Sequence, residues 1–208
     1  RIKFPDTQAR KFLKNITGLW IIQESKKIWD KSVNHSFAEL VQMSKKATPF
    51  QSYIDPDHPS FMNPSHMVDA IQSYLQRSNQ PVLKDIPSIC RCIFESLAMK
   101  YQQTLKQLIE ITGEKIDHIH LIGGGAQNQV LCQYTANATG LPIIAGPAEA
   151  TALGNILLQA KAIGLMESQE QMQKVAANSV TTKTYSPKKI KEWAKEYGRY
   201  TQIISNFE

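Results

Sequence analysis

The feature that most constrains this chain is a run of three glycines (residues 123–125) that directly follows an apolar segment. The preceding residues 115–122 alternate in polarity and then become continuously apolar, which is typical of a buried strand. A helix is expected over residues 127–139, and a second strand and helix over 140–144 and 148–163. Because strand, loop and helix occur twice in succession, the pattern predicts a βαβ unit with parallel strands, and therefore an α/β fold.

The three glycines need a physical reason, since glycine weakens regular structure. Glycine reaches positive φ without steric cost and lets a ligand approach the backbone closely. Ahead of a helix, such a loop directs free N–H groups and the positive end of the helix dipole at a ligand, for which a phosphate or nucleotide is the natural choice. The residues fit neither a Walker A loop nor the G-x-G-x-x-G dinucleotide fingerprint. A glycine turn that serves only tight packing therefore stays open as the alternative.

The loop before the second helix also supports the prediction of a ligand site. It runs through Gly146 and Pro147 and consists of small residues. Loops at the carboxyl ends of two parallel strands form the usual ligand crevice of an open α/β sheet. Glu149 is expected in the first turn of the helix that follows, where it either complements the helix dipole or lines the nucleotide site.

The first half of the chain is predicted to be mainly helical, and the tail adds two more helices. The expected helices cover residues 13–29, 36–45, 64–76, 87–111 and 168–177, with a last one from 186 onward. Ser36 and Glu39 fit a capping box, and Asn63 is expected to cap the third helix ahead of Pro64. The proline-rich stretch over 48–63 is expected to be irregular. With so few strands for so many helices, we expect a helix-rich α/β domain with an incomplete sheet.

The distribution of charged and apolar residues along the chain limits the kinds of binding partner that we expect. The 208 residues carry a net charge of +6, with the excess in the lysine-rich tail. Nucleic-acid binders interleave such charges with exposed aromatic residues or glycines. Here the aromatic residues stand at helical spacing with the apolar ones and are expected in the core, so we expect no nucleic-acid partner. No run of about 18 apolar residues occurs, so we expect no membrane span.

The three cysteines, Cys90, Cys92 and Cys132, do not have the spacing of a zinc site. We expect buried free thiols in a reducing cytoplasm. His118 and His120 share one face of the first strand, but no carboxylate or cysteine stands at ligand spacing. We therefore assign no metal site to protein ligands alone.

Four segments of the chain closely resemble a known family. H-L-I-G-G-G-A-Q-N at 120–128 and A-G-P-A-E-A-T-A-L-G-N at 145–155 resemble the C-terminal domain of the FGGY carbohydrate kinases, in the actin-like ATPase (ribonuclease-H-like) superfamily. K-N-I-T-G-L-W-I-I-Q-E at 14–24 and Y-I-D-P-D-H-P-S-F-M-N-P at 53–64 resemble the rhamnulose kinases of that family. The resemblance covers roughly residues 10 to 205.

The resemblance implies a reaction and a set of site residues. The reaction is transfer of the ATP γ-phosphoryl group to a primary hydroxyl of L-rhamnulose, giving the 1-phosphate, with Mg²⁺ carried mainly by the nucleotide. Asn15 matches the family's substrate-contacting asparagine, and Gln23, two helical turns further on, matches its ATP-contacting glutamine. The remaining ATP-binding residues that we predict are Gly123, Gly124, Gly125, Asn128 and Glu149, of which Gly124 matches the family's ATP-binding glycine.

Simpler interpretations stay open for some of these residues. Judged by residue type alone, Asn15 is equally suited to cap a helix, and Gln23 to be a solvated helix residue. Asp55 and Asp57 could be proposed as metal ligands, but we expect them to form turns.

The resemblance also implies what this chain lacks. Residues 1–208 are expected to be a partial, nucleotide-binding C-terminal domain, without the N-terminal domain that carries the family's phosphate-binding loop and catalytic aspartate. That domain is the expected partner in a full-length cytoplasmic protein, and no catalytic residue is assigned here. An L-fuculose or xylulose kinase of the same family is the alternative, because the absent domain largely sets the choice of sugar. A non-catalytic, actin-like nucleotide-binding module is the alternative from another class.

We predict that the 208-residue chain by itself does not phosphorylate L-rhamnulose. Phosphoryl transfer depends on positioning and charge stabilisation from both sides of a cleft, and one wall does not supply them. A coupled assay with ATP, Mg²⁺ and L-rhamnulose should show no ADP formation above the blank. Measurable turnover by the purified chain would overturn this expectation.

Overall fold

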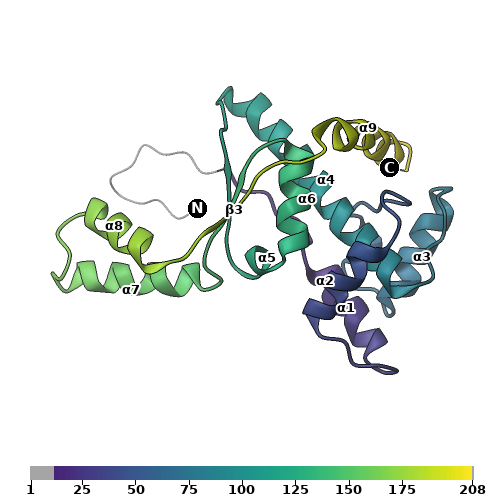
Figure 1. Ribbon diagram of the computed structural model, residues 1–208, viewed down its shortest axis with the longest axis horizontal. Coiled ribbons are helices and arrows are strands. Elements are labelled where there is room, and N and C mark those ends of the chain that lie inside the picture. Colours follow the sequence, from purple (N-terminus) through teal and green to yellow (C-terminus); the bar gives the residue numbers. More distant parts are fainter. Residues whose placement is uncertain (1–11, 208) are drawn as a thin grey trace.

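The computed structural model describes residues 12–207, which form an elongated, helix-rich α/β fold of the expected class (Figure 1). A small sheet lies near the middle, with helices α7 and α8 to one side and the remaining helices to the other. The elements are α1 (Trp20–Trp29), α2 (Phe37–Lys46), the 3₁₀ turn η1 (Pro59–Phe61), α3 (Met67–Arg77), α4 (Ile86–Thr112), β1 (Ile119–Leu121), α5 (Gly124–Gln127), α6 (Gln129–Thr139), β2 (Ile143–Ala145), α7 (Ala150–Ala162), α8 (Gln169–Ser179), β3 (Lys183–Tyr185) and α9 (Ile190–Ser205).

The sheet has the strand order β1-β2-β3 within the described residues. Strands β1 and β2 are parallel, with Ile119 opposite Ile143, so the predicted βαβ unit is confirmed. Strand β3 pairs with β2 in the antiparallel sense. Both parallel strands are shorter than predicted, because β2 is preceded by Pro142, which has no N–H to donate to the ladder. The Pro142 carbonyl accepts from the Ile119 amide at 2.9 Å, and the strand pairing begins there.

The predicted start of the first helix is wrong. Helix α1 begins at Trp20, not near Leu13, because Gly18 takes a left-handed conformation with φ at 55° that a helix cannot run through. Asn15 therefore does not cap the helix. It also does not share a helical face with Gln23, because the two residues do not belong to one helix. It lies on an irregular segment (residues 12–19) that leads into the helix.

Two other helices also begin later than predicted. Helix α3 is capped by His66, whose ring nitrogen accepts from the Asp69 amide at 3.3 Å, and not by Asn63. The backbone at His66 is still extended, with φ at −146°, so the helix cannot include Pro64. Helix α9 begins at Ile190 rather than near Ser186, because Lys189 has φ at 53°, outside the helical region.

Several predicted ends are confirmed. Ser36 and Glu39 form the capping box of α2, each accepting a hydrogen bond from the backbone of the other. Both ends of the long helix α4 lie within one residue of the predicted range 87–111. Asp85, for which no role was predicted, caps its start, and Gly113 ends it in a left-handed conformation.

Helix α4 is the centre of the hydrophobic core. Its apolar side chains, among them Ile93, Phe94 and Leu97, pack against α1, α2 and α6, in a cluster that also includes residues of α3. A second cluster, around Trp193 and Tyr200, attaches α9 to the same helix. The side of the sheet that faces α6 is covered by a third cluster.

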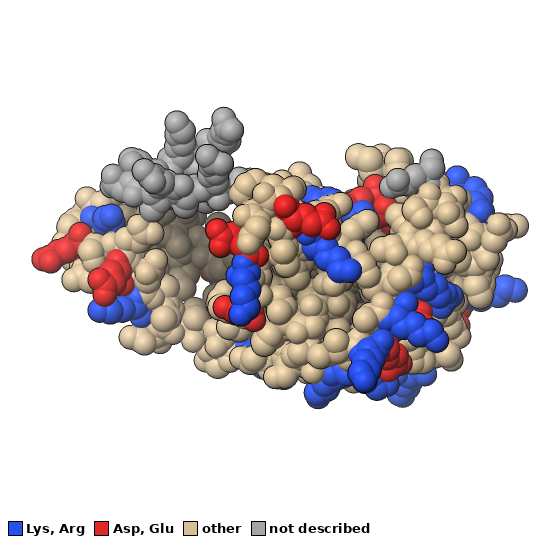
Figure 2. All heavy atoms as spheres, turned by 90° about the horizontal axis from the view of Figure 1, so that it is seen from above, with Lys and Arg blue, Asp and Glu red and all other residues tan. Residues whose placement is uncertain are grey.

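The surface carries charges of both signs. Figure 2 shows lysine and arginine interspersed with acidic side chains on one face, with basic ones more frequent at the end opposite α7 and α8. This mixture is typical of a solvated surface. No helix between residues 12 and 207 is long and apolar enough to cross a membrane.

A buried ion pair on α4 connects three segments of the fold. The Arg91 Nε donates to Glu95 Oε1 at 2.7 Å, and the guanidinium also donates to the Ala47 carbonyl, just past the end of α2. The second Glu95 oxygen accepts from the Phe50 amide at 2.9 Å. Burial raises the pKa of Glu95 to about 7, although the Arg91 guanidinium acts to lower it.

The raised pKa predicts a pH dependence of stability. Between pH 4.5, the ordinary value for this carboxyl, and pH 7, the folded chain keeps the Glu95 proton that the unfolded chain has released. The free energy of unfolding should therefore fall as pH rises through this range, by at most about 3 kcal/mol. Urea unfolding followed by circular dichroism should show this fall for the wild type and a flatter profile for Glu95→Gln. Parallel profiles of the two proteins would contradict the assignment.

Candidate functional site

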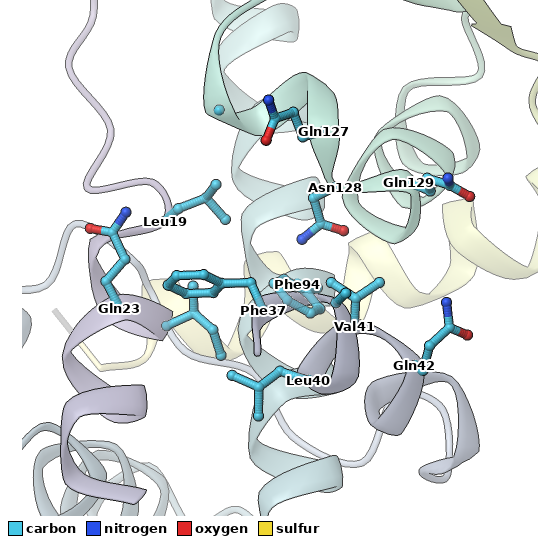
Figure 3. Close-up of a pocket in the computed structure, with 13 residues that line it drawn as sticks. Leu19, Gln23, Phe37, Leu40, Val41, Gln42, Phe94, Gln127, Asn128 and Gln129 are labelled. Atoms are coloured by element: carbon cyan, nitrogen blue, oxygen red, sulfur yellow. The ribbon is translucent and has the colours of Figure 1, made fainter. Parts of the chain in front are cut away.

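A cavity of about 430 Å³ lies between α1, α2, the middle of α4 and the glycine loop (Figure 3). This volume is within the range of small-molecule sites. The lining residues come from four parts of the chain and are Leu19, Ile22, Gln23, Phe37, Ala38, Leu40, Val41, Gln42, Phe94, Gly124, Gln127, Asn128 and Gln129.

The cavity is apolar with neutral amide groups around it. Ile22, Leu40 and Phe94 are buried and form part of its apolar wall, while the Phe37 ring is half exposed. Figure 3 shows the amide side chains of Gln23, at one side of the cavity, and Asn128, at the other, among those around it. None of the lining residues within the described chain is charged. Such a cavity suits a flat, neutral heterocycle with hydrogen-bonding edges better than it suits a phosphate group.

Two of the three glycines have different structural roles. Gly123 has φ at 75° and ψ at −156°, a conformation almost confined to glycine, and its amide donates to the Pro147 carbonyl at 3.1 Å. Gly124 lines the cavity, and a Cβ atom built there would meet nothing within 4 Å. Gly123 therefore serves the backbone turn, whereas the missing side chain of Gly124 keeps the cavity open.

Asn128 has two roles at once. Its Oδ1 accepts from the amides of Val130 and Leu131 at 3.1 and 3.0 Å, which makes it the N-cap of α6. The carbonyl oxygen is thus committed to the helix, and the amide nitrogen is the group left for a ligand in the cavity.

The structure brings together three of the residues predicted from the sequence. Gln23, Gly124 and Asn128 all line the cavity. Asn15 is exposed, and it lies outside the cavity lining, as do Gly123 and Gly125. Glu149 is also absent from the lining.

The predicted place of Glu149 in a first helical turn is wrong. It is the N-cap of α7, with φ at −100° and ψ at 39°, and its side chain makes no capping hydrogen bond. The loop therefore continues through Glu149, two residues past the Pro147 carbonyl that holds Gly123.

Sequence reasoning missed the contribution of α2 to the cavity. Phe37 and Val41 lie four residues apart on that helix and both face the cavity, as Gln42 does beside them. The i, i+4 spacing of these two apolar residues was visible in the sequence, but it was equally compatible with ordinary core packing.

The cysteines and histidines do not form a further centre in the described residues. Cys90, Cys92 and Cys132 are free and buried, as predicted, and burial raises their pKa values. His118 and His120 are exposed neighbours whose Nε2 atoms lie 3.1 Å apart. No group of three or more metal-binding side chains occurs between residues 12 and 207.

The fold defines the class of protein. The chain is similar to xylulose kinase from Rhodospirillum rubrum, with a TM-score of 0.62 and 13% identity over 91% of this chain and 38% of that chain. It is also similar to Plasmodium falciparum glycerol kinase with ADP, with a TM-score of 0.65 and 12% identity over 92% of this chain and 37% of that one. At such identities the comparison establishes the fold alone, which is that of sugar kinases with the actin-like ATPase architecture.

The family follows from the sequence match. Residues 8–163 match the model of the FGGY family of carbohydrate kinases, C-terminal domain, and the chain belongs to this family. It is 40% identical to the rhamnulokinase of Bacteroides thetaiotaomicron, over 93% of this chain and 39% of that protein. It is 38% identical to the rhamnulokinase of Bacillus subtilis, over 86% of this chain and 37% of that protein. The chain thus spans less than two fifths of the length of these relatives.

The different roles of the two glycines predict different effects of alanine substitution. Gly123→Ala should lower the free energy of unfolding by about 1–3 kcal/mol, because alanine is strained in this conformation. Gly124→Ala should leave it nearly unchanged, since its Cβ enters open space. Urea unfolding of both variants provides the measurement. Equal losses of stability would show that the backbone assignment of Gly123 is wrong.

Proposed function

We propose that this chain forms the ATP-binding wall of a rhamnulose kinase. The complete enzyme would transfer the γ-phosphoryl group of ATP to the primary hydroxyl of L-rhamnulose, giving L-rhamnulose 1-phosphate. The relatives at 38–40% identity are both rhamnulokinases, which favours L-rhamnulose over L-fuculose or xylulose. The segments at 14–24 and 53–64, which resemble rhamnulose kinases in particular, support the same choice.

The observation that carries the proposal is the shared cavity of Gln23, Gly124 and Asn128. The first two are about a hundred residues apart in sequence, and each matches a nucleotide contact of the family. We assign the adenine base to the cavity, with the Gln23 amide at its polar edge and Phe37 beside its face. Because Gly124 has no side chain, the nucleotide can pass close to the backbone of the loop.

The remaining parts of the reaction follow from the same assignment. Mg²⁺ would arrive with the nucleotide and neutralise charge on its phosphates. Asn15 is exposed on the segment just before α1, and we assign it to the sugar. The phosphate-binding loop and the catalytic aspartate would come from the N-terminal domain. The free, buried state of all three cysteines supports a cytoplasmic location for the enzyme.

Nucleotide binding provides the direct test. In the full-length kinase proposed here, Gly124→Leu should fill the cavity and weaken MgADP binding at least tenfold, as measured by titration calorimetry. Gln23→Ala should weaken it about fivefold, the loss of one hydrogen bond. Gln76→Ala is the matched control, because Gln76 is an exposed glutamine on α3, away from the cavity.

Unchanged affinity in Gly124→Leu would exclude the cavity as the nucleotide site. A parallel kinase assay with L-rhamnulose, L-fuculose and D-xylulose should give the highest kcat/KM for L-rhamnulose. A higher kcat/KM for L-fuculose or D-xylulose would instead identify the protein as a kinase of that sugar. Absence of phosphorylation with all three sugars would favour a non-catalytic module.

A further inference from the structure

The segment at residues 12–19 carries Asn15 and leads to Gln23, yet it has no regular structure of its own. Ile16 and Leu19 pack against the core. The backbone hydrogen bond that holds this segment is made by Thr17, whose amide donates to Asp57 Oδ1 at 3.0 Å. The Thr17 hydroxyl lies 3.4 Å from the same oxygen.

Asp57 is itself held rigidly. Its other oxygen, Oδ2, lies 3.2 Å from the Nζ of Lys100, and the same ammonium group donates to Asp55 Oδ1 at 2.8 Å. The Asp57 amide donates back to Asp55 Oδ1 at 3.1 Å, which confirms the turn expected for these two residues. The Lys100 side chain is only 7% exposed and comes from the middle of α4, at the end of a continuous run of buried residues over 89–100.

Charge complementarity explains why this arrangement is stable. Burial acts to lower the pKa of Lys100, but the two carboxylates outweigh it and raise the pKa, so the ammonium stays charged. A buried ammonium group between two carboxylates has little freedom to move, because each ion would otherwise lose its partner in a poorly solvated site. The Oδ1 of Asp57 is therefore presented to Thr17 in one orientation.

We propose that Asp57 is a positioning residue of the kinase, which fixes through Thr17 the spacing between the sugar contact Asn15 and the nucleotide contact Gln23. Thr17 lies two residues after Asn15 and just before Gly18, the turn from which α1 begins. A shift of this backbone moves Asn15 directly, whereas Gln23 is held on α1 by the core. Misplacement of reacting groups by about 1 Å can lower a rate about a hundredfold. The inference rests on the proposed function, since it needs both substrates.

The test compares Asp57→Ala and Asp57→Asn with a matched control in the full-length kinase. Asparagine keeps an oxygen that can accept from Thr17, whereas alanine does not. Asp85→Ala is the control, because Asp85 caps the N-terminus of α4, the helix that carries Lys100, and its loss destabilises the fold without contact to residues 12–19. We expect kcat/KM for L-rhamnulose to fall at least tenfold in Asp57→Ala, less in Asp57→Asn, and less than twofold in Asp85→Ala.

Hydrogen exchange distinguishes positioning from general destabilisation. The Thr17 amide should exchange fastest in Asp57→Ala, at an intermediate rate in Asp57→Asn, and as slowly as the wild type in Asp85→Ala. The proposal is overturned if Thr17 exchange rises while kcat/KM stays at the control value, or if kcat/KM falls equally in the two alanine variants. Should Asp57→Ala fail to fold, Asp57→Asn decides by the same two readouts. An inactive wild-type enzyme would instead refute the proposed function. A failure of the positioning role of Asp57 can therefore be distinguished from a failure of the proposed function.

Discussion

The structure depends on the burial of α4 together with the charged side chains that it carries into the core. Arg91, Glu95 and Lys100 are all buried on this helix. A buried charge is strongly unfavourable unless it is paired and hydrogen-bonded. Arg91 and Glu95 pair with each other on the helix. Their further partners, and those of Lys100, come from outside it: the Ala47 carbonyl just past α2, the Phe50 amide, and the carboxylates of Asp55 and Asp57. The proline-rich connection between α2 and α3 is laid against α4 in this way.

The cavity follows from the same packing. Helix α2 provides much of its wall, and Arg91 holds the end of that helix through the Ala47 carbonyl. Phe94 lies on α4 between Arg91 and Glu95 in sequence, and its ring lines the cavity (Figure 3). The glycine loop completes the site from the other side, since α6 packs along α4 and carries Asn128 at its start. A neutral apolar cavity is thus formed next to a buried ion pair.

Much of the fold could be predicted from local patterns. The capping box at Ser36, the glycine that ends α4 and the two strand–loop–helix units depend on residues close in sequence, and all are present. The predicted helix starts are wrong where neighbouring residues compete to end or cap a helix. Gly18 prevents α1 from extending back to Leu13, as the apolar spacing predicts, and His66 rather than Asn63 caps α3. Helical periodicity is weak evidence at such ends, because conformation there is decided by one or two backbone angles.

The glycine loop, the parallel strand pair and the family could be predicted without the structure, because each depends on short segments whose physical requirements are local. Gln23 and Gly124 were separate candidates at that level. Their common cavity with Phe37 and Asn128, and the position of Glu149 outside it, became evident from the packing of the helices. Only the tertiary structure joined Lys100 to Asp55 and Asp57 across more than forty residues. Contacts of that kind depend on how helices pack, and no local pattern encodes the partner of a buried charge.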